Sequence, residues 1–527
     1  QLWVLQSRPV TTLRPIWTRK IAAEVIPGAI RPLTWAINRP LTCGVWGDIF
    51  TIVLGDRATD LDFTDTATLH YSHAYFNATL LGEIFTRMGL PAESLDFLTR
   101  GAKFQKPPLG ATLRNVPGLL RLLRREWTLP NAFEKDQQTL FQPALEQLQA
   151  RPAQDLTAAE RKERVEQILS LLKRVTYYNI LGPLSFALRQ TLLKVEGQQL
   201  NNQVNPEIGA VADLRALAHR FRPLITRLDL PLDSPAHFFA MLQQHPEGGP
   251  VLAALEKFLD EYGYLSEVAT DIAVPTWREH PQVIQTLFIH ALKAAPPPSE
   301  APPSAPAQTW KTRQVQARLA LKGQIATTYN RLLALLRESF VAQAQDWLQQ
   351  GHVDTAEDIF FLTWAEVRSQ LTQPTFDTHL RAQIAARRAQ WQTDRDLRPP
   401  YLTYGNVSPQ VMLAPQSAAP TSTLRGIGAS PGQIEGEIRV VVSLAAVTES
   451  LPEAAILVVP YTDAGWAPLL TQISGLVAEV GGQLSHGAIV AREFGIPAVM
   501  DVAEATQKLT DGQRVRLDGQ RGTIEIL

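Results

Sequence analysis

Residues 399–424 constrain the fold of this chain more than any other stretch. The prolines of this stretch, set among serine, alanine and threonine, are Pro399, Pro400, Pro409, Pro415 and Pro420. Proline lacks a backbone donor and clashes with the preceding turn, so no helix is expected to pass through it. We predict an interdomain linker over 403–424. About 20 extended residues at ~3.3 Å each could span roughly 65 Å.

The chain before the linker has a helical pattern, and we predict one large, mainly α-helical domain at 13–402. Apolar residues recur at helical spacing after the capping-box pair Thr157 and Glu160. Gly182-Pro183 is expected to break or kink that helix. Residues 294–307 hold six prolines, and we expect them to form a loop inserted within the helical domain.

After Arg425 the pattern changes to short strands. Glycine turns lead into the apolar runs 438–442, 456–459 and 475–479, and an Asp-Gly turn near the end indicates a hairpin. Strands and short helices alternate over about 100 residues, which predicts a compact α/β domain at 425–527. The fold class is therefore multidomain, a large helical domain followed by an α/β domain.

Bulk properties exclude several classes of function. A chain of 527 residues is too long for a single core. Its 50 basic and 51 acidic residues leave a net charge of −1, which gives no support for a nucleic-acid or membrane partner. Cys43 is the only cysteine, so a cysteine metal cluster is excluded. With no apolar run near the roughly 18 residues that span a bilayer, we expect a cytoplasmic protein.

His486 is the strongest candidate for chemistry. It follows Gly481, Gly482 and Ser485, a glycine turn and a good N-cap, so it is expected to open a helix. A phosphate on its ring would lie near backbone N–H donors and the positive end of the helix dipole. Neutral imidazole is a nucleophile whose phosphorylation gives a covalent intermediate. A lone histidine at a helix start more often has a structural role, so the surrounding motif decides.

The segment resembles the phosphohistidine swivelling domain of the phosphoenolpyruvate-utilising enzymes. That pattern has a glycine pair, a small polar residue before the histidine, Ala-Arg-Glu and Gly-x-Pro-Ala-Val, and residues 481–499 contain every element. The resemblance covers 425–527 and implies that His486 is a phosphoryl carrier supported by Gly481, Gly482 and Ser485. Arg492 lies on a different helical face from His486, so we expect it to brace the domain or to meet a partner surface.

The first residues resemble the last strand of the ATP-grasp domain of the same family. Gln6 and Arg8 match a Gln-x-Arg pair that contacts nucleotide phosphates and their metal. We therefore expect residues 1–12 to be the tail of an ATP-grasp domain whose body would lie upstream. ATP and Mg²⁺ would bind on that missing part, in the same chain or in another one.

The order of helical domain and then histidine domain is similar to that of rifampicin phosphotransferase. In phosphoenolpyruvate synthase a barrel follows the histidine domain, whereas this sequence ends 41 residues after His486. The resemblance therefore implies that the acceptor is a small molecule bound in the helical region.

One stretch of the helical region is similar to a Tyr-Gly-His-Arg segment of the family. Tyr264 and Leu265 stand where the histidine and arginine are common, so a proton-accepting or anion-holding pair is lost or is replaced by acidic residues nearby. Glu267, Asp271 and Arg278 are the candidate acceptor-site residues. The structural alternative for these three is an ion-pair cluster that stabilises a loop.

Residues 51–76 contain two further features. His70 and His73 would share one helix face if 66–76 is helical, but structural roles are expected for both and no metal site is predicted. Residues Thr51–Asp65 could form a short hairpin.

The main hypothesis is a dikinase-type phosphotransferase fragment. In it His486 carries a phosphoryl group, derived from ATP, to a small-molecule acceptor in the helical domain. A split or non-catalytic phosphoacceptor or binding module is one alternative. Activity like that of phosphoenolpyruvate synthase is another, against which the absent barrel argues.

Overall fold

The computed structural model describes residues 15–88, 109–195, 199–232, 234–293, 309–372, 376, 378–395, 397, 399–405, 423–442, 452, 455–462, 466–470, 472–482 and 485–527. The predicted ATP-grasp tail at 1–12, with Gln6 and Arg8, lies outside these residues. The proline-rich segment 294–307 and most of the linker also lie outside them. A large, mainly helical region is followed by a C-terminal α/β domain, as predicted. The chain divides into two compact units.

The first unit combines the start of the chain with residues 360–364 and 376–405. Its described elements are β1 (Ile16–Thr18), α1 (Lys20–Val25), α2 (Pro32–Leu54), β2 (Ala67–His70), β3 (His73–Asn77), α3 (Ala78–Arg87), α14 (Thr378–Arg395) and β4 (Leu402–Tyr404). The strands form a sheet in the order β2-β3-β1-β4. Ala67, Ala74 and Phe76 pack with apolar residues of α1, α2 and α3 in the core of this unit.

The predicted hairpin lies later in the chain than Thr51–Asp65. The helix α2 continues to Leu54, and 3₁₀ turns follow as far as Thr66. The observed hairpin is formed by β2 and β3. Apolar residues of α2, such as Phe50 and Leu54, are buried in the core of the unit, and this burial stabilises helix where we had allowed a strand.

His70 and His73 do not share a helix face. They are direct cross-strand partners on β2 and β3, separated by Tyr71 and Ser72, whose φ angles of 50° and 57° give the hairpin its tight turn. The residues around them are rich in β-branched and aromatic side chains, which favour strands. Both rings are buried, and burial lowers the pKa of each histidine, that of His73 to about 3.

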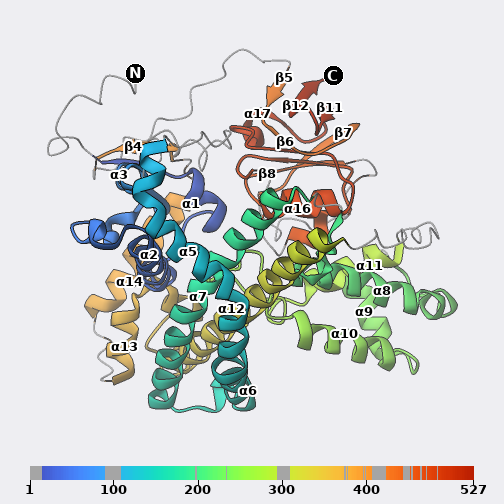
Figure 1. Cartoon of the computed structure of the whole chain (residues 1–527). Helices are drawn as coiled ribbons and strands as arrows, with labels where there is room; N and C mark the ends of the chain where they lie inside the picture. The colour runs from blue at the N-terminus through green and yellow to red at the C-terminus, as the bar shows by residue number, and fades with distance from the viewer. Residues whose placement is uncertain are drawn as a thin grey trace. The chain divides into compact units, whose positions relative to one another are not determined.

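The second unit holds the long helices. Its helices are α5 (Leu109–Asp136, which begins in the first unit), α6 (Gln142–Ala150), α7 (Ala158–Leu193), α8 (Pro206–Arg227), α9 (Pro235–Gln244), α10 (Gly249–Tyr262), α11 (Gln282–Lys293), α12 (Trp310–Gln349) and α13 (Trp364–Thr372). Figure 1 shows α7 and α12 packed side by side. Among the described helices, none combines the length and the apolar character that crossing a membrane requires.

Two buried arginines join α7 to α12. Arg161 donates to Gln343 at 2.9 Å and to Asp346 at 2.5 Å. Arg164 donates to Ser339 at 3.1 Å and pairs with Glu338 at 3.2 Å. Each buried guanidinium thus has several partners, which offsets the cost of removing it from water. The capping box at Thr157 and Glu160 is present, as predicted.

The helices α8 to α11 enclose a separate apolar core. It includes Leu214 and Ala218 of α8, Phe238 of α9, Phe258 of α10 and Phe288 of α11. This core fixes the direction of α8, whose N-terminal turn carries a residue of the site described below.

The C-terminal domain belongs to the second unit. Its elements are β5 (Thr423–Arg425), β6 (Ile427–Ser430), β7 (Gln433–Val440), β8 (Ala455–Val459), α15 (Ala467–Leu470), β9 (Gly475–Ala478), α16 (His486–Glu493), β10 (Ala498–Met500), α17 (Ala505–Lys508), β11 (Arg514–Asp518) and β12 (Thr523–Ile526). The sheet order is β5-β12-β11-β7-β8-β9-β10-β6, and β7 to β10 run parallel.

Alternate residues of the parallel strands enter two different cores. Leu457, Val459 and Leu476 face α15 and α16, whereas Ile456 and Val458 face the side that holds α17 and β11. Strands buried on both faces have nearly continuous apolar sequences. The helix α16 follows the carboxyl end of β9, the edge at which parallel sheets usually place their functional groups.

Candidate functional site

The turn between β9 and α16 places His486 at the first position of a helix. Gly481 has a φ of 116°, which side chains rarely tolerate, and a Cβ at this position would meet Ser485 Oγ at 2.9 Å. Gly482 has an ordinary φ and open space around it. Of Gly481 and Gly482, it is therefore Gly481 whose backbone conformation requires glycine.

Ser485 occupies the N-cap position, as expected, but its hydroxyl turns back and donates to the carbonyl of Gly482 at 2.7 Å. The capping acceptor is instead Thr462 Oγ1, which receives the N–H of Gly487 at 3.1 Å. A Cβ on Gly487 would lie 2.3 Å from that oxygen. The close approach of Thr462 thus explains the glycine after the histidine.

Arg492 lies on the far side of α16. Its Nη1 donates to the carbonyl of Ala429 on β6 at 2.7 Å, and burial lowers the pKa of its guanidinium. In this position the side chain ties α16 to an edge strand of the sheet, which agrees with a bracing role for Arg492.

The ring of His486 is held by a carboxylate from α8. Its Nδ1 lies 3.1 Å from Oε1 of Glu207, and the two side chains are 20% and 12% exposed. The other ring nitrogen, Nε2, is buried, and none of the residues that the structure describes forms a hydrogen bond with it. Buried polar atoms nearly always have partners, so this nitrogen marks a position where a reacting group belongs.

Further charged and polar groups lie close to Glu207. Burial alone would raise the pKa of its carboxyl, but the charge and hydrogen bond of His486, its own backbone N–H and Lys322 together hold the pKa below its ordinary value. Burial lowers the pKa of the Lys322 ammonium, whereas the negative charge of Glu207 raises it. Burial raises the pKa of Tyr264, and the charge of Glu207 raises it further. The hydrogen bond with Thr327 acts in the opposite direction and lowers that pKa.

Several contacts fasten the C-terminal domain to this end of α8. Asn202 Nδ2 donates to Oε2 of Glu493 at 2.6 Å, and the guanidinium of Arg215 lies 5.0 Å from the ring centre of Phe494. Ile208 and Val211 are buried in the same apolar cluster as α15 and α16. His486 is therefore docked against the helical part in this structure.

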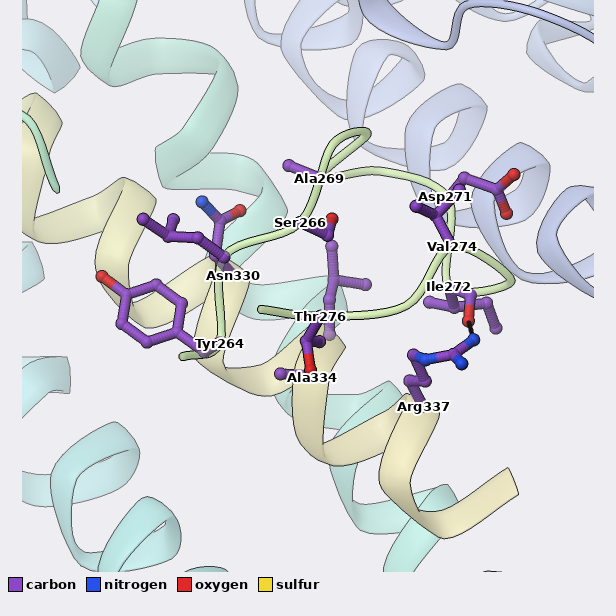
Figure 2. Close-up of a pocket in the computed structure, with 12 residues that line it drawn as sticks. Tyr264, Ser266, Ala269, Asp271, Ile272, Val274, Thr276, Asn330, Ala334 and Arg337 are labelled. Carbon is purple, nitrogen blue, oxygen red and sulfur yellow. Dashed lines mark hydrogen bonds between the residues drawn. The ribbon is translucent and has the colours of Figure 1, made fainter. Parts of the chain in front are cut away.

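The predicted acceptor residues lie in the loop after α10, shown in Figure 2. Arg278 forms ion pairs with Glu256 at 2.9 Å and Asp260 at 2.6 Å. Asp271 accepts the N–H of Ala273 at 2.9 Å, and its carboxylate points away from Tyr264 and Arg337. Glu267 is half-buried in the same loop. An acceptor role for these residues stays a prediction.

The same loop is clamped to α12. Arg337 donates to the carbonyl of Ile272 at 2.8 Å and to Glu279 at 2.7 Å. A shallow hollow lies between the loop and the helix, lined in part by Tyr264, Ser266 and Asn330. The hollow is small, and Arg337 holds the loop on α12 through its contacts with Ile272 and Glu279.

Two family models match this chain. Residues 451–522 match the mobile domain of the PEP-utilising enzymes, and residues 185–350 match the fourth domain of rifampicin phosphotransferase. Two segments of the chain are thus similar to domains of PEP-utilising enzymes. His486 lies in the first matched segment, and Glu207, Tyr264 and Lys322 lie in the second. The docked contact therefore joins the two matched segments.

Curated relatives agree with this assignment. A rifampicin phosphotransferase of Streptomyces sviceus is 28% identical over 55% of this chain and 36% of its own length. One of Bacillus cereus is 27% identical over 63% of this chain and 41% of its own length. A prodigiosin synthesizing transferase of Serratia marcescens is 41% identical over 24% of this chain and 14% of its length. The chain thus spans well under half of these relatives.

A solved structure of aconitase X from Thermococcus kodakaraensis also matches 20% of this chain and 98% of its own, at 21% identity and a TM-score of 0.17. That score is too low to carry an argument.

Glu207, Lys322 and Thr462 were not predicted from the sequence. Glu207 follows Pro206 at a helix start, where an acidic residue is ordinary because it favours the helix dipole. A better signal was present at Lys322, a lysine that directly follows the apolar residues 319–321 in a long helix. A lysine removed from water requires a partner, and the charge of Glu207 acts on this one.

Proposed function

We propose that this chain is the carrier and acceptor part of a phosphotransferase in which His486 carries a phosphoryl group. The observation that supports this most is the state of the His486 ring. One nitrogen is held by Glu207, while the buried Nε2 has no hydrogen-bond partner among the described parts of the chain. A nucleophilic nitrogen needs an available lone pair directed at the reacting atom.

In the proposed reaction the Nε2 lone pair forms a bond to phosphorus when the group is loaded, while the bond from that phosphorus to the donor's oxygen breaks and its electron pair leaves with the donor oxygen. On delivery that bond breaks, its electron pair returns to Nε2, and an oxygen of the acceptor forms the new bond to phosphorus. Lys322 and Tyr264, which lie in the segment that matches the fourth domain and whose pKa values respond to the charge of Glu207, are proposed to bind or orient an acceptor.

The donor is proposed to be ATP with Mg²⁺, bound on an ATP-grasp domain in the same chain or another one. Gln6 and Arg8 are the residues of this chain proposed to contribute to it. The acceptor is proposed to be a small molecule. One relative is named for rifampicin and another for prodigiosin synthesis, so the family name does not fix the acceptor of this chain.

The test is phosphorylation of the full-length gene product with ATP labelled in its β-phosphoryl group. We expect an acid-labile, base-stable label on His486, and His486→Ala should carry none. The ring of His486 is partly exposed at the surface of its domain, so the substitution is expected to leave the fold intact, which thermal unfolding would check. Absence of label on the wild-type protein, or equal labelling of His486→Ala, would contradict the proposal.

A further inference from the structure

The proposed function leaves open why a carboxylate faces the carrier histidine. Glu207 lies in the first turn of α8, on the fourth-domain side of the contact, and meets only Nδ1 of the ring. A carboxylate accepts hydrogen bonds, so the Nδ1 beside it must carry a proton. In the neutral ring the other nitrogen, Nε2, is then unprotonated.

The surroundings of Glu207 support an ionised carboxylate. Lys322 of α12 acts on it from the helical side and His486 from the C-terminal domain, and both lower its pKa. Tyr264 is the further titratable group near it, and its own pKa is raised by burial. The proton-donating His486 ring and the cationic Lys322 therefore both act on the carboxylate of Glu207, which stabilises its charged form.

The position of this proton matters for delivery of the phosphoryl group. If Nδ1 carries a proton, cleavage of the P–Nε2 bond releases neutral imidazole, and the acceptor hydroxyl loses its proton to water. If Nδ1 carries none, the same cleavage releases an imidazolate anion, a much poorer leaving group. A group that holds the Nδ1 proton therefore favours transfer away from the ring.

We infer that Glu207 is a positioning residue which keeps the proton of His486 on Nδ1 and directs Nε2 at the acceptor, so that the carrier is prepared for delivery only when it is docked on the helical part. This rests on the proposed function of His486. Because Glu207 belongs to the fourth-domain side, it acts on delivery and leaves loading by the donor unaffected.

The first test is a spectroscopic one on the full 527-residue chain. Histidine-selective ¹⁵N labelling reports which ring nitrogen is protonated, and His486→Ala identifies the resonances among the ten histidines. We expect a protonated Nδ1 and an unprotonated Nε2 in the wild type. In Glu207→Gln, which keeps size but loses charge, the two nitrogens should become similar or exchange roles.

Asn202→Ala is the matched control. It removes a docking hydrogen bond to Glu493 but does not contact the His486 ring, so the ring signature should stay as in the wild type. A protonated Nε2 in the wild type, or an unchanged signature in Glu207→Gln, would overturn the inference. If Asn202→Ala left the C-terminal domain docked and still changed the signature as much as Glu207→Gln does, the effect would not depend on Glu207, and this would overturn the inference too.

A second test separates delivery from loading. Phosphoramidate can phosphorylate His486 without ATP, and release of inorganic phosphate to water is then followed. Carboxylates that orient histidines typically change activity by 10–100-fold, so Glu207→Gln should slow release by about tenfold or more. Equal release rates in a folded Glu207→Gln variant would contradict the inference. Failure of ATP labelling in the full-length protein would instead count against the proposed function alone.

Discussion

Two polar clusters in the second unit look alike in sequence but differ in structure. The loop after α10 carries Arg278 and Glu279, and the start of α8 carries Glu207. In the loop, Glu279 is held by Arg337, and Arg278 has two carboxylate partners. At α8, Glu207 holds one nitrogen of His486 while the other nitrogen has no partner.

The comparison shows that a charged residue indicates function when its neighbours are incompletely satisfied. Charges that all find partners stabilise a fold, whereas a buried atom left without one is costly and is retained where chemistry needs it. The sequence named Glu267, Asp271 and Arg278 of that loop as the candidate acceptor site, with an ion-pair cluster that stabilises a loop as the alternative. Arg278 forms ion pairs with Glu256 and Asp260, and both interpretations stay predictions.

The largest stability effect that sharpens this contrast is expected from Arg337→Ala. Its side chain is 9% exposed and that of Glu279 is 34% exposed, and the substitution also removes a bond to Ile272. Breaking a buried pair costs about 3–5 kcal/mol, so with Glu279 partly exposed we expect a loss of about 3 kcal/mol in chemical denaturation. The ¹⁵N signature of His486 should be unchanged. Loss of phosphoryl release without loss of stability would make the loop a functional site.

Acidification should have a smaller effect, through Glu279. Burial alone would raise the pKa of this carboxyl, but the hydrogen bond and charge of Arg337 place it below the ordinary value of 4.5. A depressed pKa contributes stability that is present above the ordinary value and is lost as the pH falls through the folded-state value. The unfolding free energy should therefore decrease below about pH 4.5. In Glu279→Gln that decrease should be shallower, and an identical acid profile would contradict this assignment.

The smallest effect is expected from Arg278→Ala. The side chains of Arg278, Glu256 and Asp260 are 46%, 62% and 69% exposed. Exposed ion pairs contribute about 0–1 kcal/mol each, so the unfolding midpoint should hardly move and phosphoryl release from His486 should persist. A strong reduction of release with unchanged stability would revive Arg278 as an acceptor-site residue.

The C-terminal domain was largely predictable because its signals are local. The apolar runs gave β8 and β9, and Gly481, Ser485 and Gly495 bounded the short helix that begins at His486. What the local pattern could not show is the direction of individual side chains. Ser485 donates backwards to Gly482, and the cap comes from Thr462, 25 residues away in sequence.

In the helical region, the positions of proline predicted the helix ends less well than the local signals of the C-terminal domain predicted its elements. The helix α7 continues through Gly182 and Pro183, so the expected break is absent there, whereas the kink that was the other expectation stays a prediction. A Cβ on Gly182 would lie 2.9 Å from Ile325 on α12, so the two helices pack closely at this point. Packing along long helices outweighs the local cost of a proline. Contacts between residues far apart in sequence also explain why Glu207 was missed, since its partner His486 lies 279 positions later in the chain.

The helix α8 contributes to two cores at once. Leu214 and Ala218 belong to the core of α8 to α11, whereas Ile208 and Val211 are buried with the C-terminal domain. Departure of that domain would expose these two side chains to water. At about 1.5–3 kcal/mol for each buried aliphatic side chain, this corresponds to roughly 3–6 kcal/mol. Because about 1.4 kcal/mol is a factor of ten in an equilibrium constant, burial of these two side chains weights the equilibrium between the docked and undocked C-terminal domain. In the proposed function, this equilibrium would set the share of time that His486 spends at the helical part.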